Sequence, residues 1–278
     1  MDSDSTKSEQ IDLSDPLERT WIHFFRSLGD NVLHLMEYLG GLTNLILETV
    51  RTAFRYKFPF RSFMEIMHFV GVQSLNVITL IGIFTGMVMA LQFSVGLGRF
   101  GLKMYTGQVI GVSITREIGP VLSSLMIAAR VGSGIAAEIG SMVVTEQVLA
   151  IKALGANPVH KLVLPRVLAA TLSAPILALV ADVIGIFGGM WITVIEAGVT
   201  PRYYLDQIQR TVDIGDVFSG LAKTIFFGFF IGIISSYEGL KTAGGTAGVG
   251  KATTSAVVVS SLMVFIADFF LTKLFLLI

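Results

Sequence analysis

The sequence predicts an all-α membrane protein with five transmembrane helices, and its composition and its apolar segments both indicate this fold class. Of the 278 residues, 53% are hydrophobic and only 14% are charged, whereas a soluble domain carries about 25% charged residues. A spanning helix needs about 20 mostly apolar residues. Five segments meet that requirement, and they cover residues 69–95, 106–136, 165–194, 217–237 and 252–276. Residues 63–278 are therefore assigned to one membrane domain.

The region before the first span differs in character. Residues 1–16 are acidic and rich in serine, and they contain no apolar core of a signal peptide; we expect a disordered tail. Residues 17–62 place aromatic and aliphatic side chains at helical spacing beside basic ones, which is typical of amphipathic helices lying in the membrane interface. Gly40–Gly41 is expected to break this region into two helices. The second of them ends in a basic cluster of Arg51, Arg55, Lys57 and Arg61.

Two of the spans carry signs of irregular packing. The second and third exceed the minimum length, so tilt, kinks or projecting ends are expected. Pro120 and Pro175 each remove one backbone donor, and we expect kinks there. Glycines four residues apart let helix backbones approach closely, which indicates a tight bundle; the pairs are Gly82/Gly86, Gly185/Gly189 and Gly228/Gly232.

Basic residues predict how the chain is oriented. With a cytoplasmic N-terminus, the inner segments hold Arg51, Arg55, Lys57, Arg61, Lys152, Lys161, Arg166, Lys241 and Lys251. The outer loops then hold only Arg99, Lys103, Arg202 and Arg210. This asymmetry favours the cytoplasmic N-terminus, and five spans place the C-terminus outside. The outer loop 195–216 is expected to contain a short helix that begins at Pro201.

Several classes of function are disfavoured. The net charge is zero, so no overall field attracts nucleic acid, and the absence of cysteine excludes thiolate catalysis. The four histidines are scattered, and no metal site is expected. Two glycine-rich patterns, residues 96–101 and 245–251, lack the strand that must precede a nucleotide-binding loop. No cofactor is therefore expected on this chain, and any ATPase must be another chain.

Ionisable residues inside the spans include Arg116, Glu117, Arg130, Asp182, Lys223 and Asp268. Each costs about 2.5–3.5 kcal/mol at the centre of a bilayer, so they should face the bundle interior or a wet cavity. Arg116 and Glu117 point about 100° apart on a helix and must find separate partners. An anionic headgroup suits Arg116. Lys223 either contributes to the same electropositive cavity or reaches to the membrane surface.

A polar segment from about Glu138 to Leu154 is too mixed in composition to span a bilayer. We expect it to form one helix, which Gly155 and Pro158 terminate. Connections between bundle helices usually have about 2–8 residues. A helical insertion on the basic side therefore indicates a surface for a partner.

Four central motifs resemble the signature of the MlaE/YrbE permease family: Thr115-Arg-Glu-Ile-Gly-Pro120, Ala129-Arg-Val-Gly-Ser-Gly134, Ala137-Glu-Ile-Gly140 and Thr145-Glu-Gln147. Lys251-Ala-Thr-Thr254 and Ala267-Asp268 resemble it too. The similarity extends from about residue 60 to the C-terminus. Family members are the membrane subunits of ABC transporters that move phospholipids between the inner and outer membranes.

The resemblance implies a homodimeric permease with an interfacial elbow helix and five spans, in the inner membrane of a Gram-negative-type bacterium. It implies a cytoplasmic ABC ATPase that holds ATP and magnesium, a periplasmic MCE-domain protein and a small STAS-domain subunit as partners. Phospholipid is the implied substrate, and outer-membrane lipid asymmetry is the implied outcome.

The same resemblance assigns roles to residues. Arg116 and Glu117 would belong to the lipid cavity, with Lys223 beside them. The segment from Glu138 to Leu154 would be the coupling helix seated in the ATPase, and its candidate contacts are Glu138, Thr145, Glu146, Gln147 and Lys152. The family commonly has an acidic residue where this chain has Leu149, so no salt bridge is expected from that position.

Two other classes of function remain open on the sequence. An ion-coupled secondary transporter or exporter would use Glu117, Asp182 and Asp268 as a proton path. It would need no ATPase, although the chain lacks the internal repeat common in such transporters. A scaffold for a peripheral enzyme would leave the charged pair at Arg116–Glu117 without a function.

Overall fold

The structure is a computed structural model that describes the backbone of residues 16–56 and 59–277, and the side chains from residue 29 onward except Asn31. The acidic tail predicted at residues 1–16 thus lies outside the described residues apart from Pro16, as does Lys57 of the basic cluster. The chain divides into two compact units, Met1–Asn44 and Leu45–Ile278.

Helix α1 (Pro16–Arg55) is one continuous helix of 40 residues. The break expected at Gly40–Gly41 is wrong, because both glycines are helical. A glycine in a helix costs only about 0.5–1 kcal/mol relative to alanine. Good helix formers flank the pair on both sides, so the two glycines do not end the helix.

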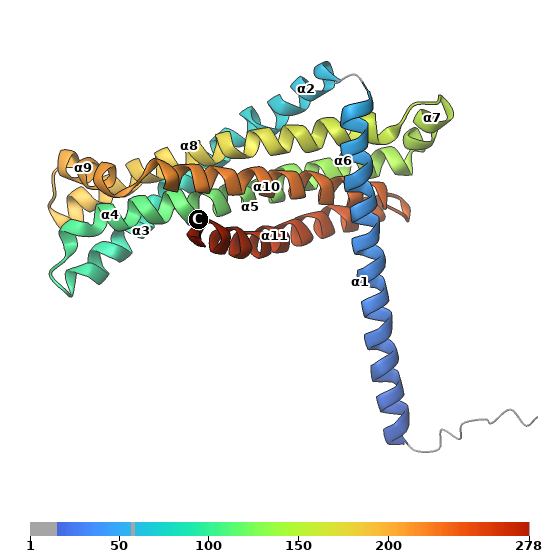
Figure 1. Cartoon of the computed structure of the whole chain (residues 1–278), viewed down its shortest axis with the longest axis horizontal. Coiled ribbons are helices and arrows are strands. Elements are labelled where there is room, and N and C mark those ends of the chain that lie inside the picture. Colours follow the sequence, from blue (N-terminus) through green and yellow to red (C-terminus); the bar gives the residue numbers. More distant parts are fainter. Residues whose placement is uncertain (1–15, 57–58, 278) are drawn as a thin grey trace, which may run out of the picture. The chain divides into compact units, whose positions relative to one another are not determined.

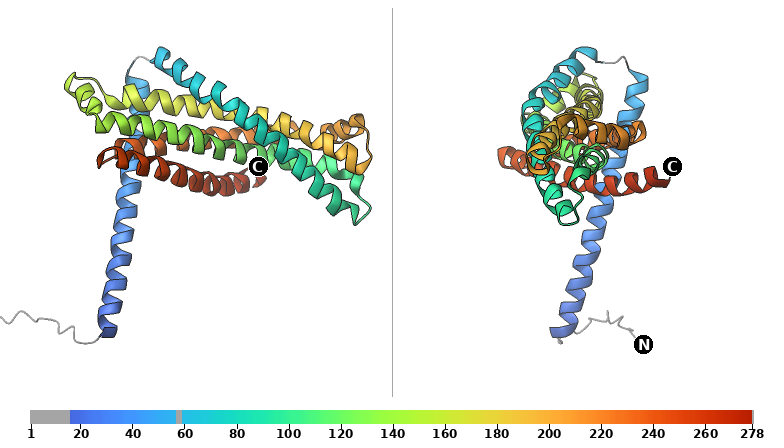
Figure 2. Two further views of the ribbon diagram at one scale, coloured as in Figure 1. Left: turned by 180° about the vertical axis from the view of Figure 1, so that it is seen from behind. Right: turned by 90° about the vertical axis from the view of Figure 1, so that its left-hand side faces the viewer.

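The second unit contains five helical stretches that are long and apolar enough to cross a membrane, and they run side by side (Figures 1 and 2). They cover Phe60–Gly98, Lys103–Val144, Val159–Ala197, Ile214–Leu240 and Gly245–Leu277. Each predicted span lies within one of them. The described residues contain no strand. The all-α membrane fold and the five spans are therefore confirmed.

The stretches are built from shorter elements. The first consists of α2 (Phe60–Val70), a 3₁₀ turn (Val72–Ser74) and α3 (Leu75–Gly98). The second contains α4 (Thr106–Ser113), α5 (Gly119–Ile127) and α6 (Ser133–Val144), with π-helical segments at Ile114–Ile118 and Ala128–Gly132. The third joins a π-helical segment, Val159–Val163, to α8 (Leu164–Ala197), which continues through Pro175. The last two are α10 (Ile214–Leu240) and α11 (Gly245–Leu277).

The paired glycines lie where helices cross. A Cβ on Gly86 would overlap the carbonyl of Gly185, and one on Gly82 would lie 3.1 Å from the carbonyl oxygen of Ala181. Likewise a Cβ on Gly228 would lie 2.6 Å from the carbonyl oxygen of Ala170. The glycines therefore bring α3 and α10 into backbone contact with α8, which is the central helix of the bundle.

Short helices close the two ends of the bundle (Figure 1). At one end α9 (Pro201–Thr211) joins α8 to α10; it begins at the predicted proline, and the Thr200 hydroxyl caps it by accepting from the Tyr203 amide at 3.3 Å. At the other end α7 (Gln147–Ala153) lies between α6 and α8.

The segment from Glu138 to Leu154 is not one helix, which corrects the sequence prediction. α6 ends at Val144, and Glu146 has φ 59°, in the left-handed region that interrupts a helix. The exit matches the prediction: Gly155 has φ 74°, and its amide and the Ala156 amide donate back to Lys152 and Ile151 at 2.9 and 3.1 Å. This is the Schellman pattern that glycine favours.

Candidate functional site

Arg116 and Glu117 lie in the π-helical segment Ile114–Ile118, in the middle of the second stretch. Such segments are rare and are frequently found at functional sites. Pro120 lies two residues after this segment. It has no N–H to donate to the carbonyl of Arg116, four residues before it. The Lys223 ammonium donates to this carbonyl oxygen instead, at 3.1 Å. Pro120 thus leaves a backbone acceptor within the bundle, and a charged side chain from α10 binds it.

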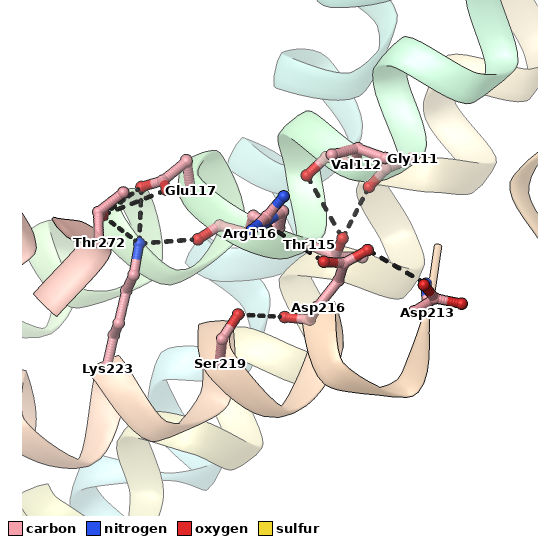
Figure 3. Close-up of polar contacts among 10 residues, drawn as sticks. All are labelled: Gly111, Val112, Thr115, Arg116, Glu117, Asp213, Asp216, Ser219, Lys223 and Thr272. Atoms are coloured by element: carbon pink, nitrogen blue, oxygen red, sulfur yellow. Dashed lines mark hydrogen bonds and ion pairs between the residues drawn. The ribbon is translucent and has the colours of Figure 1, made fainter. Parts of the chain in front are cut away.

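The two adjacent charges have different partners, as their angular separation predicts (Figure 3). Arg116 Nε lies 3.3 Å from Asp216 Oδ1, while Glu117 Oε2 lies 2.8 Å from Lys223 Nζ. The expected partner of Arg116 was an anionic headgroup; in the structure a carboxylate of α10 holds one edge of the guanidinium. The two terminal nitrogens of Arg116 make no hydrogen bond within the described part of the chain.

Lys223 is buried inside the bundle, with only 2% of its side chain exposed. Its ammonium donates to Glu117 and to the Thr272 hydroxyl at 2.6 Å, and it forms an ion pair at 3.1 Å with Asp268 Oδ1. Such hydrogen bonds and ion pairs offset the free-energy cost of burying a charged group. Lys223 therefore does not reach to the membrane surface, and it connects the second, fourth and fifth spans.

Asp216 is held in place by the start of its own helix. Asp213 caps α10, and its amide donates to Asp216 Oδ2 at 3.1 Å in a reciprocal capping box. The other carboxylate oxygen is thereby directed to Arg116 (Figure 3). Sequence reasoning missed this residue and Thr272. The Asp-x-x-Asp spacing before an apolar run was the available signal for Asp216; Thr272 had none.

A cavity of about 290 Å³ opens beside these charges, and Arg116, Glu117 and Lys223 all line it. Apolar side chains complete the wall, among them Val112, Phe275 and Leu276. The side chains of Arg116 and Glu117 are 35% and 39% exposed, so both are accessible from the cavity. The structure therefore brings the three predicted site residues together.

The carboxylates of this site outnumber the cations, so the cavity is not electropositive as expected. Two cations, Arg116 and Lys223, face three carboxylates, those of Glu117, Asp216 and Asp268. The reason is that α10 and α11 each supply an acid next to a cation. An incoming anionic group must therefore compete with Asp216 for Arg116, or use the guanidinium nitrogens that Asp216 does not occupy.

The remaining intramembrane charges lie away from this cluster. Arg130 donates to the Ser74 hydroxyl at 2.6 Å and to Gln73 at 3.3 Å, and it lies over the ring of Phe69. Asp182 is buried in α8 beside Gly119, and its Oδ1 has no hydrogen-bond partner within the described part of the chain. No ion pair joins Asp182 to Lys223 among the described residues.

At the opposite end of the bundle, α7 and its flanking turns form a segment that we call the coupling segment, residues 145–157. Thr145, Glu146, Gln147 and Lys152 are exposed on it. So are Leu149 and Leu154, at 60% and 85%, whereas Val148 is buried against the bundle. Glu138 lies before this segment, on α6, where its side chain is 62% exposed and forms an ion pair with Arg166 of α8 at 2.7 Å.

Comparison with known proteins identifies the family of this chain. The family model described as Permease MlaE matches residues 63–274. A probable ABC transporter permease protein of Rickettsia bellii is 39% identical over 254 residues, covering 91% of this chain and 98% of the relative. The intermembrane phospholipid transport system permease protein MlaE of Haemophilus influenzae is 34% identical over 256 residues, covering 91% and 97%. This chain therefore belongs to the MlaE permease family, a family of multi-pass membrane permeases.

Proposed function

We propose that this chain is the permease subunit of an ABC transporter that moves phospholipid between the inner membrane and an MCE-domain partner in the periplasm. The observation that carries the proposal is the partly exposed Arg116 side chain in a cavity that charged and polar groups line together with Val112, Phe275 and Leu276. An amphiphile with a phosphate and acyl chains fits such a cavity, and lipid tails alone would not require the charge. The name of the Haemophilus relative supports the same substrate.

In this proposal the phosphate of the lipid binds the terminal nitrogens of Arg116, since arginine binds phosphate oxygens in a bidentate manner. Asp216 fixes the orientation of the guanidinium from its other edge. The acyl chains lie along Phe275 and Leu276. Lys223 keeps the neighbouring Glu117 from repelling the phosphate, because it neutralises that carboxylate.

A partner supplies the energy. ATP and magnesium bind to a cytoplasmic ABC ATPase, which contacts the coupling segment through Thr145, Glu146, Gln147 and Lys152. With Leu149 and Leu154 exposed on the same surface, much of this contact is apolar. The helical stretch Lys103–Val144 connects the coupling segment directly to Arg116, so movement at one end is transmitted to the cavity.

The resemblance to the family is also the basis for the proposed subunit composition and orientation. Two copies of the chain enclose the lipid path, with the N-terminus cytoplasmic and the C-terminus periplasmic in an inner membrane, and a small STAS-domain subunit accompanies the ATPase. The fifth span supports a second copy, because only 17% of its apolar window is buried within one chain. Phospholipid transport by this system maintains the lipid asymmetry of the outer membrane.

Purification from native membranes, followed by mass spectrometry of proteins and lipids, tests the proposal. We expect an ABC ATPase, an MCE-domain protein and stoichiometric phospholipid. A preparation that carries no nucleotide-binding chain would overturn the proposal and favour the ion-coupled transporter that uses Glu117, Asp182 and Asp268. An ATPase without bound lipid would contradict the assignment of the substrate.

A further inference from the structure

The last part of α1, residues 45–55, belongs to the same compact unit as the membrane bundle. One side of this part is buried, with Leu45 at 7%, Thr49 at 3% and Thr52 at 3% exposure. The Thr49 hydroxyl donates to the Leu45 carbonyl at 2.7 Å, so this buried hydroxyl has its hydrogen-bond partner within the helix. One face of residues 45–55 is therefore covered by other parts of the protein.

The opposite side of the same helical part is exposed and apolar. Leu47, Val50 and Phe54 are 49%, 43% and 89% exposed, and their spacing places them on one stripe. Arg51 and Arg55 are exposed beside this stripe. An apolar stripe flanked by arginines is suited to the lipid interface. This part of α1 thus has the bundle on one side and a lipid-compatible surface on the other.

Two contacts connect this part of the chain to the exit of the coupling segment. Asn157 Nδ2 donates to Glu48 Oε1 at 3.2 Å. The rings of Tyr56 and His160 lie with their centroids 5.1 Å apart. The partners are separated by more than 100 residues in the sequence, so they report tertiary packing and not local helix geometry.

Asn157 has a second function that fixes its side chain. Its Oδ1 accepts from the Val159 amide at 2.7 Å, in a turn that leads into the π-helical segment at the start of the third span. With this oxygen occupied, the amide nitrogen is directed to Glu48. One side chain therefore joins the coupling segment, the third span and α1.

We propose that residues 45–56 position the coupling segment: Glu48 and Tyr56 hold Asn157 and His160, so that the coupling segment and the lipid-facing part of α1 move as one body. This inference rests on the proposed function, since it adds a second element that the ATPase moves. Glu48 and Asn157 are positioning residues, because neither touches the lipid cavity.

The contact between Asn157 and Glu48 can be broken without removing the hydrogen bond from the Val159 amide. Asn157→Asp keeps an oxygen for the Val159 amide but loses the donor and places a second carboxylate against Glu48. Glu48→Gln in the same chain restores a hydrogen bond in the opposite direction, because the glutamine amide can donate to the new aspartate. The matched pair of variants therefore separates loss of the contact with Glu48 from loss of the hydrogen bond to the Val159 amide.

Hydrogen exchange of the chain in lipid nanodiscs gives a first readout that needs no partner. A net hydrogen bond contributes about 0.5–1.5 kcal/mol, which corresponds to about two- to tenfold in an opening equilibrium. We expect exchange at the amides of residues 153–157 to accelerate by that factor in Asn157→Asp, and to return to the wild-type rate in Glu48→Gln/Asn157→Asp. Equal exchange in all three proteins, or no recovery in the double variant, would overturn the inference.

The complete complex gives the second readout. In the transporter purified from native membranes, lipid moved per ATP hydrolysed should fall by a similar factor in Asn157→Asp and recover in the double variant, with normal ATPase association. Because the chain has no cysteine, Glu48→Cys/Asn157→Cys joined by a short bismaleimide should still transport. Transport blocked by this link would show that the two parts separate during the cycle and overturn the inference. Absence of an ATPase from the wild-type complex would instead count against the proposed function, and the exchange measurement would still stand.

Discussion

Arg166 of α8 and Glu138 of α6 form an ion pair of 2.7 Å between the helices that enter and leave the coupling segment. The two side chains differ in environment: 5% of the Arg166 side chain is exposed, against 62% for Glu138. Arg166 also donates to the Leu162 carbonyl at 2.6 Å, while its Nε is buried without a partner in the described part of the chain. Glu138 therefore neutralises a buried cation at the base of the coupling segment.

Replacing Glu138 with alanine should lower the free energy of unfolding by about 1–3 kcal/mol, because a buried charged donor is left unpaired. Unfolding of the purified chain in detergent, by heat or denaturant, measures this. Glu65→Ala is the matched control: Glu65 pairs with Arg61 at 3.4 Å, but 68% and 94% of these side chains are exposed. That change should stay within about 0.5 kcal/mol, and equal losses in both variants would refute the role given to Glu138.

Arg116→Ala should reduce the phospholipid that co-purifies with the chain by about tenfold or more, since it removes charge-assisted hydrogen bonds worth about 1.5–3 kcal/mol. Assembly with partners should be unchanged, because Arg116 faces the cavity. Quantitative lipid mass spectrometry checks the loss. Arg210→Ala is the control, because Arg210 is an exposed arginine paired with Asp206 outside the cavity. Wild-type lipid content and transport in Arg116→Ala would remove Arg116 from the lipid site.

Much of this site could be predicted from local sequence. The lengths of the apolar segments predict the spans. The separate partners of Arg116 and Glu117 follow from the angle between neighbouring residues on a helix. The partners themselves could not be predicted. Asp216 is 100 positions from Arg116 in the numbering, and only the packing of α10 against the second stretch brings the two together.

Backbone features were the least predictable. Gly40–Gly41 suggested a break, but a long helix tolerates two glycines. Conversely, Glu146 sits between helix-forming residues, yet its φ of 59° ends α6. Nothing local favours glutamate in that conformation, which L-residues with a Cβ rarely adopt. The turn is therefore set by the packing of α7, which buries Val148.

Glu146→Lys should weaken binding of the ATPase, because Glu146 is exposed on the coupling segment and the substitution reverses its charge. Co-purification of the ATPase from native membranes is the measurement. Glu146→Gly separates the effect of the side chain from that of the backbone conformation, since glycine adopts a positive φ without strain. Asp206→Lys, an equal charge reversal on α9 at the other end of the bundle, should leave association unchanged. A normal complex from Glu146→Lys would argue against the docking surface.

Lys223→Met should destabilise the chain by about 3–5 kcal/mol, because it leaves Glu117 and Asp268 as uncompensated carboxylates inside the bundle. Adding Glu117→Gln and Asp268→Asn to the same chain removes both charges and should recover part of the loss. The unfolding free energies of these variants and of the double variant Glu117→Gln/Asp268→Asn form a cycle that isolates the interaction. Strictly additive values would mean that the three groups do not form one network.

Gly86→Ala should disrupt the contact between α3 and α8. The new Cβ would overlap the carbonyl of Gly185, and two helix backbones cannot shift independently of the rest of the bundle. Overpacking of this kind typically costs about 1–3 kcal/mol. Gly96→Ala, in the same helix, has no atom within 4 Å of the added Cβ and should be neutral or stabilising by up to about 1 kcal/mol. Unfolding of both variants under identical conditions tests this prediction. If Gly86→Ala is as stable as Gly96→Ala, the backbones of α3 and α8 do not approach as closely as the structure shows. The central position of α8 in the bundle would then have to be revised.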